Sequence, residues 1–435
     1  MSEFLLPAAM ALVVLTGILA GYRVGMVLAG SAALFILVSD LPIAFFSLLI
    51  SRVYANVLSN WLLVAVPMFI FMGFLLELSG VAERSLRAAQ QAMGGSAAGM
   101  GLSVLAISVL LAASSGIVGA SVVLLTMLAL PRLKDAGFDK QTAAGLTAAS
   151  GTLAILIPPS VMLIVLADQL QVPVPDMFTA ALVPGLLLVS MYGLFSVWRA
   201  RKLPPLKIET KISAWRLILD LGPLVVLVVA VLGSILAGVA TPTEASGLGA
   251  LGAIFITVIY GRFNLHNTME AARRTVVTTS MVLFVMIGAT CFSAVFKGIG
   301  GDDMVEAGIM AFGTEPITVL TVLMVSVFLL GFFLDWLEIS LILLPLFAPL
   351  VSGLDFGNGL SGTPLLVWFG ILVAVNLQTS FLTPPFGFSL FYLKGAAGNT
   401  LQTTEIYKGV IPFILLQLFV LLLLIIFPWL ITGMI

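Results

Sequence analysis

Apolar segments of helix length recur along the whole chain, and they constrain the fold more than any other feature. A helix needs about 20 apolar residues to span a membrane. Segments of roughly this kind cover 4–20, 24–38, 57–79, 142–166, 177–198, 217–239, 245–260, 275–296, 364–390 and 409–431. Only 9% of the 435 residues are charged, against roughly 25% in a soluble domain. The runs are continuous rather than alternating, so the sequence predicts an all-α polytopic protein embedded in a lipid bilayer.

Several classes of protein are excluded by composition. The net charge is −1, so no basic surface is available for nucleic acid. Cys291 is the single cysteine and His266 the single histidine, which excludes an intrachain disulfide and a Cys/His metal site. No basic residue precedes the first apolar run, so we expect residues 4–20 to be a retained span rather than a signal peptide.

Two further apolar stretches, 97–130 and 317–351, are too long for one span and are interrupted near the middle. Small and polar residues at 114–119 interrupt the first, and the sequence Asp-Trp-Leu-Glu at 335–338 interrupts the second. Each stretch therefore predicts a hairpin that enters and leaves the membrane on the same side.

The distribution of Lys and Arg predicts the orientation, because cytoplasmic loops are enriched in both. Segment 199–216 holds six basic residues and one acidic residue, and is predicted to be cytoplasmic. Segment 298–316 holds four acidic residues and no basic ones, and is predicted to be periplasmic. Hairpin 97–130 then opens to the cytoplasm and hairpin 317–351 to the periplasm. Only Arg52 and Lys297 of the 19 basic residues remain outside, and both termini are periplasmic.

The two halves of the chain follow the same order of segments. Each has two spans, an amphipathic piece (41–56 or 261–274), a third span, a hairpin, a broken span and a last span. An odd number of spans per half inverts the second half, as in many secondary transporters. The predicted domains are a first inverted five-helix repeat at 1–198, a cytoplasmic linker at 199–216 and a second repeat at 217–435.

Paired prolines break one span in each half. Pro158 and Pro159 lie 226 residues before Pro384 and Pro385. Each proline removes a backbone hydrogen bond, and the freed groups are tolerated in a membrane only where they line a polar cavity or bind a ligand. Simple kinks in unrelated spans are the alternative interpretation.

Hydroxyl and amide side chains precede both pairs, at 150–152 and 376–383. Neutral oxygens of this kind suit a hard cation such as Na⁺, and half-helix N-termini suit an anionic substrate. Ser and Thr in membrane helices also serve as packing groups, which is the alternative here.

Asp335 and Glu338 are the charges deepest within an apolar stretch, and their spacing places both on one helix face. A charge at the bilayer centre is costly unless it has a partner or water. The alternative is a shallow hairpin whose tip reaches water.

The Ser-Ser-Gly at 114–116, the Ser-Gly-Thr at 150–152 and the two proline motifs at 157–160 and 383–387 resemble the large membrane subunit of tripartite ATP-independent periplasmic (TRAP) transporters. The resemblance covers essentially the whole chain. It implies an elevator mechanism in the bacterial inner membrane, import driven by Na⁺, a small four-helix membrane subunit and a periplasmic solute-binding protein. No organic cofactor is implied.

The resemblance also implies two Na⁺ sites. The first consists of Ser115, Gly116, Ser150, Gly151 and Thr152. The second consists of Asp335, Gln378, Thr379 and Thr383. Many members of the family have Ser where this chain has Ile117, so one ligand of the first site differs. The motifs around Asp335 and Pro384 resemble the branch labelled mannitol/chloroaromatic or 2-oxo-acid, and we expect a small organic monocarboxylate as the solute.

Three other functions remain open from the sequence. A stand-alone Na⁺-coupled dicarboxylate or anion transporter of the same superfamily would need no binding protein. An intramembrane enzyme would need a catalytic dyad at depth, which the spans lack. A passive channel would not need inverted repeats. The sequence favours the translocating subunit of a TRAP importer.

Overall fold

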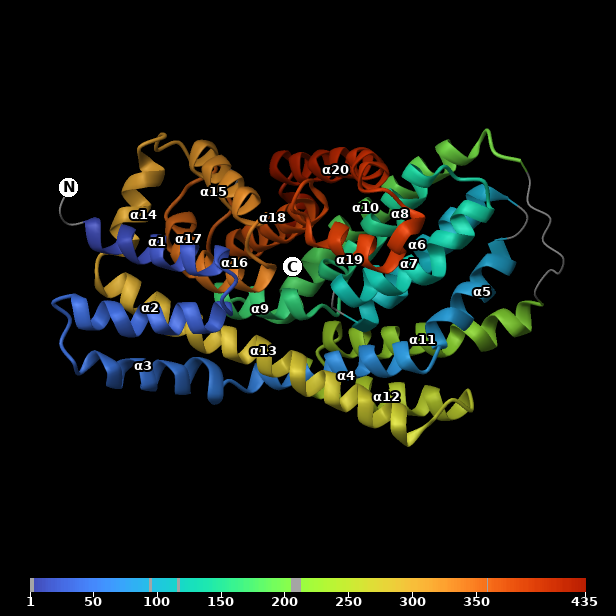
Figure 1. The fold of residues 1–435 in the computed structure, drawn as a ribbon, viewed down its shortest axis with the longest axis horizontal. Helices are drawn as coiled ribbons and strands as arrows, with labels where there is room; N and C mark the ends of the chain where they lie inside the picture. The colour runs from blue at the N-terminus through green and yellow to red at the C-terminus, as the bar shows by residue number, and fades with distance from the viewer. Residues whose placement is uncertain (1–3, 94–95, 116–117, 205–212, 358) are drawn as a thin grey trace.

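Nearly every described residue lies in a helix or in a short turn between helices, and the described residues contain no strand. The computed structural model describes residues 4–93, 96–115, 118–204, 213–357 and 359–435. The helical content of these residues confirms the predicted all-α class (Figure 1).

The first half of the chain contains ten α-helices among its described residues. They are α1 (Leu5–Leu19), α2 (Val24–Val38), α3 (Phe45–Val53), α4 (Ala65–Leu78), α5 (Val81–Met93), α6 (Ala97–Ser115), α7 (Val118–Asp135), α8 (Lys140–Thr152), α9 (Val161–Leu170) and α10 (Val174–Ala200). A short 3₁₀ turn, Trp61–Val64, leads into α4, and another, Leu153–Ile155, follows α8.

The second half repeats this order. Its helices are α11 (Ala214–Leu236), α12 (Pro242–Ile259), α13 (Leu265–Gly298), α14 (Gly301–Met310), α15 (Pro316–Leu330), α16 (Trp336–Ile342), α17 (Leu344–Ser352), α18 (Gly362–Leu382), α19 (Phe388–Ala397), α20 (Thr403–Ile426) and α21 (Trp429–Thr432). Helices α8 and α9 are the broken span of the first half, and α18 and α19 are that of the second. The predicted domain boundaries stay a prediction, and residues 205–212 of the linker lie outside the described residues.

Seven helical segments among the described residues are long and apolar enough to cross a membrane, which is consistent with a multi-pass protein. Helices α1 and α2, predicted as spans, have 15 residues each. At 1.5 Å per residue each is about 22 Å long, shorter than the roughly 30 Å hydrocarbon core. They can span only with help from their flanking residues.

Three differences from the prediction concern connecting segments. The amphipathic piece 261–274 and the span 275–296 form one 34-residue helix, α13, because no Pro or Gly interrupts the chain between His266 and Ile287. Helices α5 and α14 are not among the segments predicted from the sequence. Both are short connecting helices, and α5 is strongly amphipathic with a low apolar content, so neither has the signature of a span.

The helices form two layers, and each layer takes helices from both halves of the chain (Figure 1). In the first, here called the α13 layer, α13 packs along α2, α3 and α4, and α12 packs on α4 and α11. In the second, called the hairpin layer, α8 packs on α7 and α20, α6 on α10, and α18 on α15 and α20. Helices α5 and α14 connect the two layers.

The two predicted hairpins lie in the hairpin layer. The first consists of α6 and α7, and residues 116–117 of its tip lie outside the described residues. The second consists of α15 followed by α16 and α17, with its turn at residues 331–335. Both boundaries agree with the predicted stretches 97–130 and 317–351 to within a few residues.

Glycines allow the closest helix crossings in both layers. A Cβ added to Gly145 of α8 would lie 2.0 Å from the carbonyl oxygen of Gly409 in α20. A Cβ added to Gly288 of α13 would lie 2.5 Å from the carbonyl oxygen of Gly25 in α2. Membrane helices associate through such backbone contacts, since lipid provides no hydrophobic drive for helices to pair.

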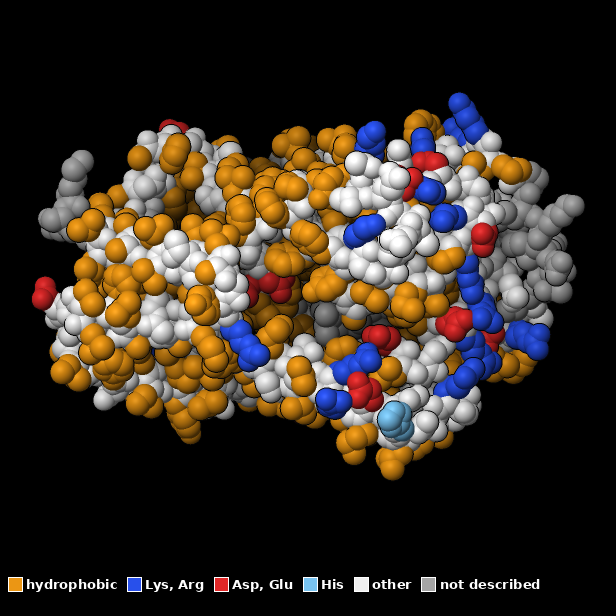
Figure 2. All heavy atoms as spheres, viewed as in Figure 1, with side chains coloured by type: hydrophobic (Ala, Val, Ile, Leu, Met, Phe, Trp, Pro, Cys, Tyr) orange, Lys and Arg blue, Asp and Glu red, His pale blue; other side chains and the backbone are white. Residues whose placement is uncertain are grey.

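Charged side chains are unevenly distributed along the long axis of the molecule. Figure 2 shows most Lys and Arg side chains over the right half of the view, where Figure 1 places α5 and α8. The left half is mostly apolar. The helices of the α13 layer run along this axis. Basic side chains are therefore concentrated at one end of the helices of the α13 layer.

The crossing of α8 and α20 predicts a specific effect of added volume. We expect Gly145→Ala to lower stability by about 1–3 kcal/mol, because backbone must move to admit the methyl group. Gly247→Ala, in α12, is the matched control, since nothing lies within 4 Å of an added Cβ there. Thermal unfolding of the purified chain in detergent measures both. Equal melting temperatures for the two variants would contradict the close crossing.

Candidate functional site

The first proline pair ends α8 within the protein interior. The carbonyl of Ile155 would accept a hydrogen bond from residue 159 in a continuous helix, but Pro159 has no N–H. The hydroxyl of Ser160 donates to this carbonyl instead, at 2.6 Å, and the contact is buried. The peptide bond between Pro158 and Pro159 is cis.

At the second proline pair, a serine hydroxyl again replaces the missing N–H donor. The carbonyl of Phe381 would accept from residue 385, which is Pro385. The hydroxyl of Ser389 donates to it at 2.6 Å, again buried, and the peptide bond between Pro384 and Pro385 is also cis. The breaks thus leave each of these two carbonyls paired with a serine hydroxyl from the following segment.

A cavity of about 300 Å³ lies where the two hairpins and the two breaks converge. Its wall in the hairpin layer combines the start of α7, the turn and start of α16, and residues flanking both breaks. Its opposite wall comes from α4 and α13. The lining residues are Ile70, Val118, Gly119, Val161, Thr278, Met281, Val282, Asp335, Trp336, Leu337, Glu338, Phe381, Phe388 and Tyr392.

Two carboxylates are the only charged side chains among these lining residues. Asp335 caps α16, accepting a hydrogen bond from the backbone N–H of Trp336 at 2.8 Å. Glu338 is only 7% exposed, and its Oε2 has no hydrogen-bond partner among the described residues. The structure places both carboxylates at this cavity, with Asp335 partly exposed and Glu338 buried. Figure 2 shows acidic side chains at the bottom of a hollow near the centre of the viewed face.

The predicted first Na⁺ site is partly described. Ser150, Gly151 and Thr152 form the buried last turn of α8. The Ser150 hydroxyl has no partner among the described residues. A Cβ on Gly151 would lie 2.5 Å from Val122 of α7, so this glycine lets α8 touch the first hairpin. Ser115 ends α6, and Gly116 lies outside the described residues.

The predicted second site lies across the break of α18. Gln378 and Thr379 are fully buried in α18, and Thr383 caps its end. The Thr379 and Thr383 hydroxyls donate to carbonyls one turn earlier, at 2.9 and 2.8 Å, so their lone pairs stay available as acceptors. The Oε1 atom of Gln378 has no partner among the described residues. Asp335 lines the central cavity together with Phe381 of α18, whereas Gln378, Thr379 and Thr383 are not among its lining residues.

A hydrogen bond joins the two predicted sites. The Nε2 of Gln378 donates to the Oγ1 of Thr152 at 3.3 Å. These residues are 226 positions apart, the spacing of the proline pairs, so each contacts its own counterpart in the other repeat. Counterparts can touch only near a pseudo-twofold axis. The breaks therefore meet at the centre of the molecule.

A bound cation would explain why the buried oxygens of Ser150 and Gln378 have no hydrogen-bond partner among the described residues. A buried oxygen without a partner costs about 1–3 kcal/mol, and both atoms are neutral hydroxyl or amide oxygens. Oxygen ligands of this type, with a carboxylate nearby, suit a hard cation. Among the described residues no group of three or more His, Cys, Asp or Glu side chains could hold a metal.

Sequence reasoning missed several residues of the site. Tyr392 of α19 lines the cavity, and its ring would be 2.9 Å from a Cβ on Gly119, at the first hairpin. Thr278 lines it from α13, and Phe388 from α19. Their positions depend on how distant helices pack. In the sequence, a single hydroxyl or aromatic residue within an apolar segment does not indicate a binding site.

Two hairpins, two broken helices and a central cavity form the arrangement of a secondary transporter. The chain matches the family model described as "Tripartite ATP-independent periplasmic transporter, DctM component" over residues 9–430. The chain belongs to this family, and it is the large permease subunit of a TRAP transporter rather than an enzyme. The family is tripartite, so the permease works with two further components.

Individual relatives agree with this assignment. The chain is 31% identical over 381 residues to the C4-dicarboxylate TRAP transporter large permease protein DctM of Rhodobacter capsulatus, covering 82% of each chain. It is 27% identical to the sialic acid TRAP transporter large permease protein SiaM of Vibrio cholerae, covering 85% of each. It is 28% identical to the isethionate TRAP transporter permease protein DctMQ of Oleidesulfovibrio alaskensis, with 90% of this chain matching 61% of that one.

A solved structure shares the fold. The crystal structure of the YdaH transporter of Alcanivorax borkumensis superposes with a TM-score of 0.64, covering 91% of this chain and 90% of that one. The sequence identity is 14%, so the likeness concerns the fold alone.

Proposed function

We propose that this subunit imports a small organic anion across the inner membrane together with Na⁺. The observation that carries the proposal is the charge of the central cavity. Two carboxylates and no Lys or Arg line it, so an anionic solute would be repelled unless cations entered with it. Coupling to a cation follows from this electrostatic balance.

The donor set supports Na⁺ as the coupling ion. Buried oxygens of Ser150 and Gln378 that have no partner among the described residues lie near the ends of α8 and α18. Thr152, Thr379 and Thr383 belong to the same two segments. Asp335 would supply the negative charge. In this proposal the first site is Ser115, Gly116, Ser150, Gly151 and Thr152, and the second is Asp335, Gln378, Thr379 and Thr383.

The solute class is proposed from the relatives and from the cavity. The relatives are named for C4-dicarboxylate, sialic acid and isethionate, which are all organic anions. A cavity of about 300 Å³ fits a small member of this class. Cations bound at the two sites would balance the negative charge of a bound carboxylate. They would also offset its repulsion by Asp335 and Glu338 at the start of α16.

The two layers suggest how the solute moves. The α13 layer would stay fixed as the scaffold, and the hairpin layer would slide past it as an elevator. The scaffold wall of the cavity at α4 and α13 consists of Ile70, Thr278, Met281 and Val282, and largely apolar surfaces slide with few hydrogen bonds to break. A small four-helix membrane subunit would pack on the scaffold, and a periplasmic solute-binding protein would deliver the solute.

Uptake by reconstituted protein tests the function. The chain should import a labelled carboxylate into liposomes only with its small subunit, the external binding protein and an inward Na⁺ gradient. Uptake that follows a proton gradient and ignores Na⁺ would reject Na⁺ coupling. Uptake by the chain without a binding protein would favour the stand-alone dicarboxylate or anion transporter.

Site-directed labelling tests the proposed orientation, with both termini in the periplasm. Lys202→Cys lies just after α10 and Asp303→Cys lies in α14, and both positions are exposed. In a Cys291→Ala background we expect a membrane-impermeant maleimide to label position 303 in intact spheroplasts and position 202 only after lysis. Labelling of both from the same side would contradict the inverted repeat.

The charge at Asp335 predicts a loss of Na⁺ affinity. Asp335→Asn keeps the size of the side chain and removes one charge-assisted contact, worth about 1.5–3 kcal/mol. We therefore expect the Na⁺ concentration for half-maximal transport to rise by about ten- to a hundredfold. The measurement is the initial uptake rate against Na⁺ concentration in proteoliposomes.

Glu306→Gln is the matched control for Asp335→Asn. Glu306 lies on the exposed surface of α14, away from the cavity residues, and its loss removes the same charge without touching the site. Its Na⁺ dependence should stay that of the unmodified protein. An unchanged Na⁺ dependence in Asp335→Asn, with normal expression, would remove this residue from the ion site.

A further inference from the structure

A second pocket, of about 310 Å³, lies at the cationic end of the molecule, where α5, α11 and the end of α12 meet. Four arginines and two carboxylates line it. These six are Glu83, Arg84, Arg87, Arg216, Asp220 and Arg262. The lining therefore carries two positive charges in excess, whereas the central cavity is negative. This pocket plays no part in the proposed transport site.

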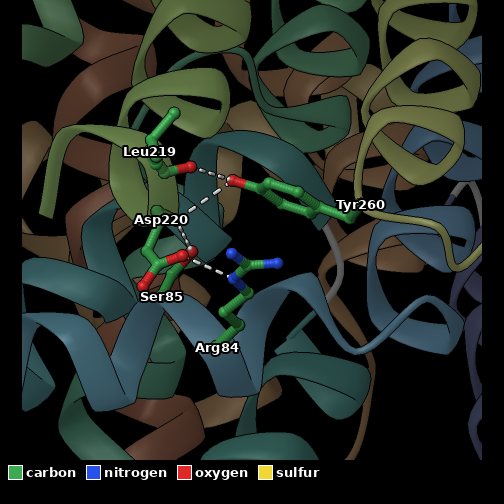
Figure 3. Close-up of polar contacts among 5 residues, drawn as sticks. All are labelled: Arg84, Ser85, Leu219, Asp220 and Tyr260. Carbon is green, nitrogen blue, oxygen red and sulfur yellow. Dashed lines mark hydrogen bonds and ion pairs between the residues drawn. The ribbon is translucent and has the colours of Figure 1, made fainter. Parts of the chain in front are cut away.

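One arginine is held in place by the fold (Figure 3). The Nε of Arg84 donates to the Oδ1 of Asp220 at 2.5 Å. Its guanidinium carbon lies 4.5 Å from the centre of the Tyr260 ring, and the Tyr260 hydroxyl donates to the carbonyl of Leu219 at 2.9 Å. Ser85 also donates to the backbone carbonyl of Asp220, at 3.0 Å. These contacts join α5 to α11 and α12.

This anchoring leaves donors free to bind an anion. Among the described residues, the two terminal nitrogens of Arg84 make no hydrogen bond or ion pair; the only such contact of its side chain there is that of Nε with Asp220. Arg87 pairs with Glu83, but Arg216 and Arg262 make no ion pair with any described residue. Both are exposed at the mouth of the pocket. Arginine presents a planar fork of N–H donors that matches the oxygens of a phosphate group.

The surroundings of the pocket point to a lipid. Helix α11 leads away from it and is the least buried of the seven span candidates, with 28% of its apolar window buried. Trp215, next to Arg216, is 69% exposed, and Phe263, next to Arg262, is 48% exposed. Aromatic residues favour the membrane–water interface, and basic pockets between helices on the cytoplasmic side bind anionic headgroups.

We infer that this pocket binds the phosphate headgroup of an anionic phospholipid of the inner leaflet. The phosphodiester sits against Arg84, Arg216 and Arg262, and the acyl chains lie along the exposed apolar face of α11. That face includes Ile218, Val226 and Val229, each more than half exposed. The lipid then contacts both α11, in the α13 layer, and α5, the helix that leads to the first hairpin. Its headgroup braces this connection between the layers.

Lipid-dependent stability tests the inference with the full chain purified in detergent. We expect dioleoylphosphatidylglycerol to raise the melting temperature by about 2–4 °C more than dioleoylphosphatidylcholine does. The double variant Arg216→Ala/Arg262→Ala should lose this difference. Both arginines are exposed and unpaired among the described residues, so their loss leaves the fold intact. Arg84 is not substituted, because it also holds α5 to α11.

Arg273→Ala provides the matched control. Arg273 is 79% exposed, lies in α13 outside the pocket and pairs only weakly with Glu270, at 3.8 Å. This variant should keep the full difference between the two lipids. Native mass spectrometry should show phosphatidylglycerol retained by the unmodified chain and by Arg273→Ala, and lost from the double variant.

Three results would overturn the inference. An equal shift with the zwitterionic lipid would show that the headgroup charge is not recognised. An equal shift in the double variant would place the lipid elsewhere. A full shift with inorganic phosphate alone would make the pocket a site for a soluble anion rather than for a lipid.

Discussion

Backbone groups buried away from water must find partners, and this constraint organises the centre of the molecule. Each proline pair removes two N–H donors from a broken span. Residues 151–160 around the first pair are all buried, and α18 is buried up to Leu382 before the second pair. The carbonyls of Ile155 and Phe381 are then paired with serine hydroxyls. Only with these bonds in place can the two helices end inside the protein. Residues next to these ends, Val161, Phe381 and Phe388, line the central cavity, and the neutral oxygens of the proposed ion sites stay buried behind them.

The two breaks also meet each other. The hydrogen bond from Gln378 to Thr152 joins counterparts of the two repeats, and Tyr192 and Gln417, 225 positions apart, form a similar buried pair at 2.8 Å. The proposed Na⁺ sites therefore share a contact at the pseudo-twofold axis. A cation that reorients Gln378 would change the surroundings of Thr152 directly. If both proposed sites bind Na⁺, this hydrogen bond would link occupancy of one site to affinity at the other without a movement of the layers.

Local sequence was enough to predict the features that depend on composition alone. The hairpins, the broken spans and the order of segments follow from apolar length and from the placement of Pro and of charged residues. The partner of Phe381 does not follow: the position equivalent to Ser160 is Phe386, and the hydroxyl comes from Ser389 instead. The continuity of α13 and the helix α5 were missed because neither shows the hydropathy of a separate span. The cavity wall at Thr278 and Tyr392 depends on packing between distant helices, which periodicity cannot predict.

The proposed sliding of the layers would have an energetic cost, and the contacts between the layers among the described residues indicate its size. Near the cavity the α13 layer presents Ile70, Met281 and Val282, whose contacts carry no direction and can be exchanged as the layers slide. Polar contacts that cross the layers include Asn60 to Asp168 at 2.7 Å and Lys297 to the carbonyl of Pro345 at 3.1 Å. Both lie beside another cavity, which is polar and has a volume of about 510 Å³. Water there can replace a broken bond, so each contact costs only about 0.5–1.5 kcal/mol to lose. The interface thus combines an apolar centre with polar contacts beside a cavity that water can enter, which is the combination that the proposed reversible slide would require.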